Sequence, residues 1–156
     1  SMVDRAVAEG AKLLCGGRRP KLPDLDGFFF EPTILGGVGN TSHLARNEVF
    51  GPVLGIARFE NFDDAVAQAN DSNFGLAGGV WTKDIHKAHR FAAALEAGTV
   101  WINMYRAIGF NSPYGGYKDS GLGRLNGFEC MGQYLQTKSV WCDLNDKPQD
   151  PFVIKL

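Results

Sequence analysis

The sequence predicts an α/β fold built on a parallel sheet, and three observations indicate this class. Extended and helical patterns alternate as strand, helix, strand, helix, strand over residues 53–102, the order produced by crossover connections in parallel sheets. The chain has 156 residues, of which 44% are hydrophobic, enough for one domain with its own core. Half of its 20 glycines gather within residues 75–127 without a fixed period, which indicates turns rather than a repeat array.

Charge and cysteine content exclude several classes of protein. The 16 basic and 17 acidic residues give a net charge of −1 and are scattered, so no basic surface for nucleic acid or anionic membrane is predicted. No apolar run reaches membrane-spanning length. Cys15, Cys130 and Cys142 are widely spaced, without a CxxC pair or a histidine cluster. They predict free thiols in a reducing, cytoplasmic compartment and no metal site.

The first elements are expected to be short. Ser1 and Met2 do not begin a signal peptide, and a serine before a methionine resembles a residue left by cloning, so the pair is left out of the predicted fold. The apolar spacing over residues 3–7 predicts a helix that ends at Gly10 and whose start lies upstream, as expected of a fragment. Residues 12–15 follow as a strand, in which Cys15 is expected to be a small buried side chain rather than a nucleophile.

The next region is predicted to alternate between loop and brief extended pieces. Two prolines favour an exposed loop over residues 18–26, and extended pieces are expected on either side of Glu31-Pro32 because a residue before proline avoids the helical region. The run Phe28-Phe29-Phe30 is predicted to lie in the core. Thr41 and Ser42 can cap a short helical turn that leads to the next segment.

One turn combines a carboxylate with an aromatic ring. The stretch Asn47-Glu48-Val49-Phe50-Gly51-Pro52-Val53 precedes a predicted strand over residues 53–59, and Gly51 and Pro52 favour a sharp turn before it. A carboxylate there can accept two hydrogen bonds from sugar hydroxyls, and a ring two residues on can pack on a flat heterocycle. Taken alone, the stretch is better explained by Glu48 as a solvated turn residue and Phe50 in the core, which is the more frequent arrangement.

Two capped helices separate the strands that follow. Asn61, with Asp64 three residues later, predicts a helix start whose apolar residues share one face. This helix is expected to stop near residues 73–75, before a strand over 76–82 with a composition suited to burial on both faces. Asp84 is expected to cap the second helix, which Gly98 ends before a strand over residues 99–102.

The last strand leads into a long aromatic and glycine-rich loop over residues 103–124. Loops of this length in a compact domain are usually functional. Its glycines match neither a phosphate-binding loop nor a dinucleotide fingerprint, so a phosphate cradle is rejected. Residues 127–133 predict a short helix, and the segment from Tyr134 to Cys142 predicts an edge or arm strand followed by a polar tail.

Two separated stretches, residues 47–53 and 97–124, together resemble the aldehyde dehydrogenase superfamily. The Glu-Val-Phe-Gly-Pro motif at 48–52 stands unchanged, and the intervening pieces follow the family's order. The resemblance covers nearly every residue after Met2. The other matching pieces are Gly-Leu-Ala-Gly-Gly-Val-Trp-Thr-Lys-Asp at 75–84, Ala-Gly-Thr-Val-Trp-Ile-Asn at 97–103 and Gly-Gly-Tyr-Lys-Asp-Ser-Gly-Leu-Gly-Arg at 115–124. The chain departs from the family at Pro113-Tyr114-Gly115-Gly116, where phenylalanine usually stands second, and at Leu125-Asn126-Gly127.

The resemblance implies that the chain is about the last third of an enzyme that uses NAD or NADP to oxidise an aldehyde to a carboxylic acid. In that family a cysteine thiolate attacks the aldehyde, the thiohemiacetal passes a hydride to the cofactor, and a glutamate activates the water that hydrolyses the thioester. These groups and the Rossmann-like domain precede this segment in the family, and none of the three cysteines lies in the nucleophile motif. No catalytic residue is therefore assigned, and the fragment alone is expected to be inactive.

The resemblance does suggest cofactor contacts and a substrate channel. Glu48 resembles the family's glutamate that binds the nicotinamide ribose hydroxyls, and Phe50 resembles the aromatic residue beside the nicotinamide. Residues 103–110 correspond to the variable wall of the aldehyde channel. Tyr105, Arg106 and Phe110 are accordingly predicted to line the substrate entrance.

The remaining residues are assigned to scaffold and assembly. Residues 113–124 are predicted to be scaffold, with the role of Lys118 left open. Residues 3–133 are predicted to form the C-terminal part of a catalytic domain and 134–156 an oligomerisation strand with its tail. By resemblance that strand docks on the sheet of another subunit in a dimer or tetramer. Two alternatives stay open: a CoA-acylating relative, which replaces water with a thiol, and a non-catalytic oligomerisation module.

Overall fold

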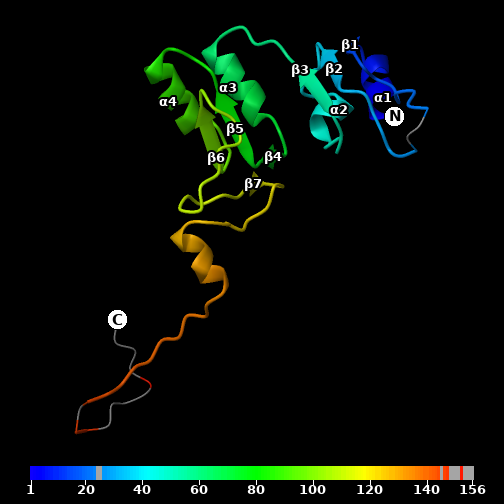
Figure 1. The fold of residues 1–156 in the computed structure, drawn as a ribbon. Coiled ribbons are helices and arrows are strands. Elements are labelled where there is room, and N and C mark those ends of the chain that lie inside the picture. Colours follow the sequence, from blue (N-terminus) through cyan, green and yellow to red (C-terminus); the bar gives the residue numbers. More distant parts are fainter. Residues whose placement is uncertain (24–25, 145, 148–151, 153–156) are drawn as a thin grey trace.

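The computed structural model describes residues 1–23, 26–144, 146–147 and 152, and it confirms the predicted α/β class (Figure 1). Two groups of elements follow one another along the chain. The first contains a three-stranded sheet with strand order β1-β2-β3 and two helices. The second contains two longer helices and a parallel strand pair. The last described residues extend away from both groups (Figure 1).

The first helix begins with the two residues that the predicted fold omits, Ser1 as its N-cap and Met2 as its first helical residue. Helix α1 (Met2–Ala8) is capped by Ser1, whose hydroxyl accepts a hydrogen bond from the Asp4 amide at 3.3 Å. The Asp4 carboxylate accepts one in return from the Ser1 amine at 3.0 Å, which completes a capping box. The chain leaves the helix through Gly10, whose φ of 101° is readily available only to glycine.

The first sheet carries the larger buried core. Strand β1 (Lys12–Cys15) pairs antiparallel with β2 (Thr33–Gly36), and β2 pairs parallel with β3 (Val53–Ile56). Helix α1 and the short helix α2 (His43–Arg46) contribute to the core beside this sheet. Burial of apolar area at this contact is the main stabilising force for the group. The buried cluster consists of Val3, Ala6, Leu35, Val38 and Leu44.

The prediction of a core role for the phenylalanine run is wrong for two of its three members. Phe28 and Phe29 are exposed, and only Phe30 packs against the core. Residues 27–30 form no strand, and three consecutive side chains of an extended segment cannot all face the same side. Cys15 is also exposed rather than a buried filler.

The two predicted helices and their caps are confirmed in the second group. Helix α3 (Phe62–Asn70) begins at Asn61, whose side-chain oxygen accepts from the Asp64 amide at 3.0 Å. Helix α4 (Ile85–Ala94) begins at Asp84, which accepts from the Lys87 amide at 3.1 Å. Such caps satisfy amide groups that lack partners within the helix. Both helices end three or four residues earlier than predicted.

The strands of the second group are shorter than predicted. The predicted strand over residues 76–82 is present only as β5 (Ala77–Val80). The separate strand β4 (Phe74–Gly75) lies where the end of the preceding helix was predicted, and it pairs antiparallel with β7 (Tyr117–Lys118). Strand β5 pairs in parallel with β6 (Thr99–Ile102). Within the described residues no ladder joins β3 to β5 or β6, so the parallel sheet consists of two separate pairs rather than one continuous sheet. Strand β3 also ends at Ile56 instead of residue 59.

The C-terminal segment differs most from its prediction. The predicted short helix is present as η1 (Phe128–Gln133), a 3₁₀ helix. The strand predicted from Tyr134 to Cys142 is absent within this chain, because residues 134–144 pair with no other strand. Figure 1 shows them running away from the two groups as an isolated segment. Every helix in the described part of the chain is too short or too polar to cross a bilayer.

Candidate functional site

The turn that carries Glu48 and Phe50 is held by contacts on both sides. It connects α2 to β3, and the amide of Thr33 on β2 donates to the Pro52 carbonyl at 2.8 Å. The Val53 amide donates to the Gly51 carbonyl at 2.8 Å, and Val49 packs against the buried cluster. These contacts fix the path of the main chain.

Two side chains project from this fixed turn without partners. The Glu48 carboxylate is exposed and makes no hydrogen bond or ion pair with the described residues. Phe50 is 88% exposed and has a φ of 50°. A bulky residue in the left-handed region is a conformational outlier, and such outliers are concentrated at functional sites. The core position considered for Phe50 is therefore wrong in this structure.

The turn lies at the amino end of β3. Many α/β sheets bind ligands beyond the carboxyl ends of their parallel strands, and the loop at residues 103–110 does follow the carboxyl end of β6. Glu48 and Phe50 instead precede their strand. In the described residues no hydrogen bond or ring contact joins this turn to the loop, so the structure does not unite the two predicted groups of residues.

The loop after β6 presents the predicted channel side chains to solvent. The Tyr105 ring meets the buried Trp101 ring edge to face, with centroids 5.6 Å apart. The Arg106 guanidinium carbon lies 5.6 Å from the centroid of the Tyr105 ring, a cation–π arrangement. Arg106 makes no ion pair with the described residues, and Phe110 is 90% exposed. The three side chains thus form an accessible surface with one positive charge.

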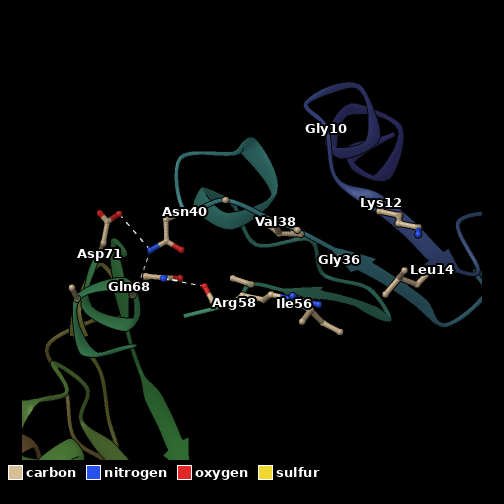
Figure 2. A pocket seen from close by; sticks show the side chains of 14 residues that line it. Gly10, Lys12, Leu14, Gly36, Val38, Asn40, Ile56, Arg58, Gln68 and Asp71 are labelled. Atoms are coloured by element: carbon tan, nitrogen blue, oxygen red, sulfur yellow. Dashed lines mark hydrogen bonds between the residues drawn. The ribbon is translucent and has the colours of Figure 1, made fainter. Parts of the chain in front are cut away.

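A large hollow lies elsewhere, between the two groups of elements. It measures about 970 Å³ and lies between the carboxyl ends of β2 and β3 and helix α3 (Figure 2). The Asn40 amide donates to the Gln68 carbonyl at 2.7 Å, and the Gln68 side chain donates to the Arg58 carbonyl at 3.0 Å. These bonds connect the first sheet to α3 across the hollow (Figure 2). None of the predicted site residues lines it.

A nearby ion pair also connects the first group of elements to the end of helix α3. Arg46 on α2 donates to the Asp71 carboxylate at 2.6 Å, just beyond the end of α3. This hydrogen bond lowers the pKa of Asp71 below its ordinary value, since it favours the charged form. We therefore assign the hollow to the junction between the two groups of elements. The candidate site stays at the turn that carries Glu48 and Phe50 and at the loop after β6.

The open question of Lys118 has a structural answer. Its ammonium group donates to the carbonyls of Asn70 at 2.7 Å and Ser72 at 3.1 Å, and forms an ion pair with Glu96 at 2.6 Å. A cation that binds the last carbonyls of a helix is stabilising there. Lys118 adopts a φ of 52° to make these contacts. It belongs to the scaffold, and sequence reasoning missed this because its partners are more than 20 residues away.

The thiols of the described part of the chain lie apart from one another. The three cysteines are free, and Cys130 is the least exposed of them. No group of three or more histidine, cysteine, aspartate or glutamate side chains gathers among the described residues. The arrangement therefore offers recognition groups, a carboxylate and several rings, rather than a nucleophile with its base.

Comparison with known proteins shows the family of the chain. The chain belongs to the aldehyde dehydrogenase family, whose model matches residues 1–140. It is 44% identical over 153 residues to the betaine aldehyde dehydrogenase of Brucella melitensis, which corresponds to 97% of this chain and 31% of that protein. The chain thus spans about a third of the length of such relatives.

Two solved structures show the same fold. The betaine aldehyde dehydrogenase of Staphylococcus aureus in complex with NAD+ has a TM-score of 0.90 and 44% identity over 96% of this chain and 30% of its own. An aldehyde dehydrogenase of Mycobacterium tuberculosis complexed with NAD+ has a TM-score of 0.85 and 44% identity over 94% of this chain and 30% of its own.

Proposed function

We propose that this chain is part of an NAD(P)-dependent aldehyde dehydrogenase that oxidises an aldehyde to a carboxylic acid through a cysteine thiohemiacetal and thioester. The observation that carries the proposal is the pair of unpartnered side chains, Glu48 and Phe50, on one anchored turn. Its relatives from S. aureus and M. tuberculosis hold NAD+, which favours NAD as the cofactor and leaves NADP as the alternative. Its free thiols favour a cytoplasmic location.

The turn is proposed to bind the nicotinamide half of the cofactor. A carboxylate can accept hydrogen bonds from both hydroxyls of a ribose, and the unpaired Glu48 has this capacity available. Phe50 presents a free ring face that can pack against the nicotinamide. Because the main chain of the turn is fixed, both groups would be in place before the cofactor binds, which lowers the entropic cost of orientation.

The loop after β6 is proposed to be the wall of the aldehyde channel. Arg106 covers one face of the Tyr105 ring, so that face is not available to a cationic substrate such as a quaternary ammonium aldehyde. The guanidinium group offers several hydrogen-bond donors and a positive charge. We propose that this wall favours aldehydes with an anionic or hydroxylated tail.

Residues 134–142 are proposed to pair with another copy of the chain in a homodimer or homotetramer. Val140 and Trp141 are highly exposed, and an unpaired apolar segment is an aggregation hazard unless a partner covers it. We expect truncation of the full-length protein after Gly132 to give a smaller oligomer or insoluble protein. A truncated protein that keeps its oligomer in light scattering would show that another surface makes the assembly.

The activity itself is testable with the full-length protein. We expect aldehyde-dependent reduction of NAD+ or NADP+, followed by absorbance, with a free acid as the product. We expect the 156-residue chain alone to show no turnover, because recognition groups without a nucleophile cannot form the thiohemiacetal. A thioester formed only with added coenzyme A would indicate the acylating reaction. No turnover by the full-length protein with any aldehyde would contradict the proposal.

A further inference from the structure

Asn103 ends strand β6 with an unusual pair of hydrogen bonds. Its side-chain oxygen accepts from the Thr82 amide at 2.8 Å, and its side-chain nitrogen donates to the Thr82 carbonyl at 2.9 Å. One amide group therefore satisfies both main-chain groups of the same residue. In the adjoining ladder, β6 is paired with β5 up to Val80 and Ile102. The Asn103 side chain extends the contact between the two strand ends by one more step.

The main chain of Asn103 turns out of the sheet at the same point. Its φ is 54°, in the left-handed region that asparagine tolerates better than most residues. The loop that carries Tyr105 and Phe110 starts here. Thr82, in turn, accepts from the Asp84 amide through its hydroxyl at 3.1 Å, and Asp84 caps α4. The start of the loop is thus connected to the fixed start of a helix.

The rest of the loop is held by separate contacts. The Trp101 indole donates to the Ala107 carbonyl at 2.8 Å, and the Phe110 carbonyl accepts from the Gly127 amide at 2.9 Å. Between Asn103 and Ala107, the side chains of Tyr105 and Arg106 are exposed. The direction in which the loop leaves β6 is therefore set by the two side-chain hydrogen bonds of Asn103 and by its amide, which donates to the Val80 carbonyl at 2.8 Å.

We infer that Asn103 is a positioning residue that sets the orientation of the aldehyde-channel wall. The inference rests on the proposed function, since it takes residues 103–110 as that wall. Asn103 acts through the loop and does not itself touch the reacting atoms. Removal of its side chain would leave the strands paired but free the loop to sample other directions, and misplacement by about 1 Å can lower rates strongly.

The test compares Asn103→Gly with a matched control in the full-length protein. Glycine accepts the same left-handed φ, so this variant removes the hydrogen bonds without adding backbone strain. The control is Asn126→Gly, because Asn126 has a φ of 60° and its side chain makes no hydrogen bond with the described residues. Amide hydrogen exchange over residues 103–112 reports the position of the loop directly, and the KM values for aldehyde and cofactor report its effect on binding.

We expect amide exchange in residues 103–112 to become about tenfold faster in Asn103→Gly, as for the loss of two hydrogen bonds. The KM for aldehyde is expected to rise about fivefold with little change in the KM for cofactor. Asn126→Gly is expected to leave all three quantities unchanged. Unaltered exchange in Asn103→Gly would overturn the inference, as would equal effects of the two variants.

A second arm separates this inference from the proposed function. Phe110→Ala changes the wall directly and leaves Asn103 intact. If Phe110→Ala raises the KM for aldehyde and Asn103→Gly does not, the channel assignment stands and the positioning role of Asn103 is wrong. If neither variant alters the aldehyde KM although Asn103→Gly loosens the loop, the channel assignment itself fails, and the role proposed for Asn103 in substrate binding fails with it.

Discussion

The turn around Glu48 and the loop after β6 are held in place by different kinds of contact. The turn is fixed mainly by its backbone, through hydrogen bonds at Gly51 and Pro52, and by apolar packing of Val49. The loop is held by backbone hydrogen bonds at Asn103 and Phe110 and, in addition, by the side chains of Trp101 and Asn103. Backbone anchoring depends little on which side chains project outward, whereas side-chain anchoring changes with single substitutions. The difference suits a fixed cofactor contact and an adaptable substrate wall.

The largest expected effect concerns the buried residues that support the turn around Glu48. Leu35 is fully buried in the cluster that also contacts Val49, and Leu→Ala in a core typically costs about 2–5 kcal/mol. We expect Leu35→Ala in the full-length protein to lower the Tm by several degrees and to speed amide exchange over residues 47–53. Phe110→Ala serves as the control, because its exposed ring is expected to leave both quantities unchanged. Equal protection of residues 47–53 in the two variants would show that the core does not support the turn.

A smaller, substrate-dependent effect is expected at the loop. Arg106→Ala removes the positive charge from the proposed wall, and a charge-assisted hydrogen bond contributes about 1.5–3 kcal/mol. We expect the KM for acidic aldehydes to rise about tenfold and that for neutral aldehydes to change little. Steady-state kinetics with a matched pair of substrates measures the difference. Equal changes for both substrates would identify Arg106 as an ordinary surface residue.

The sequence predicts local features of the fold well because their causes are local. The caps at Ser42, Asn61 and Asp84 depend on residues three positions away, and the structure confirms all three. The positions of Phe28 and Phe29 depend on packing partners far along the chain, and that prediction is wrong. Strand pairing is also a long-range property, which explains why the sequence does not predict β4, whose partner β7 lies more than 40 residues further along the chain.

The same limit applies to the candidate site. The motif around Glu48 is continuous in the sequence, so its residue types and its sharp turn are predictable. Asn103 and Lys118 act on partners at distant positions, Thr82 and the end of α3, and their residue types alone do not indicate these contacts. An asparagine directly after a strand and before a long loop is the one signal in the sequence that points to Asn103.

The central claim is that Glu48 orients the nicotinamide for hydride transfer, and the variant Glu48→Gln tests it most directly. Glutamine keeps the size of the side chain and removes its charge, so the lost charge-assisted component of about 1.5–3 kcal/mol is expected to lower kcat at least tenfold. The KM for cofactor is expected to change less, because other contacts also hold the cofactor. Hydride transfer then limits the rate to a greater degree.

The decisive measurement is the primary deuterium isotope effect on kcat, with aldehyde labelled at C1, for the full-length protein and its Glu48→Gln variant. We expect a larger isotope effect in the variant together with the lower kcat. An unchanged isotope effect and an unchanged kcat, with only a lower Tm, would identify Glu48 as a structural residue of the turn and contradict the assignment of a cofactor contact.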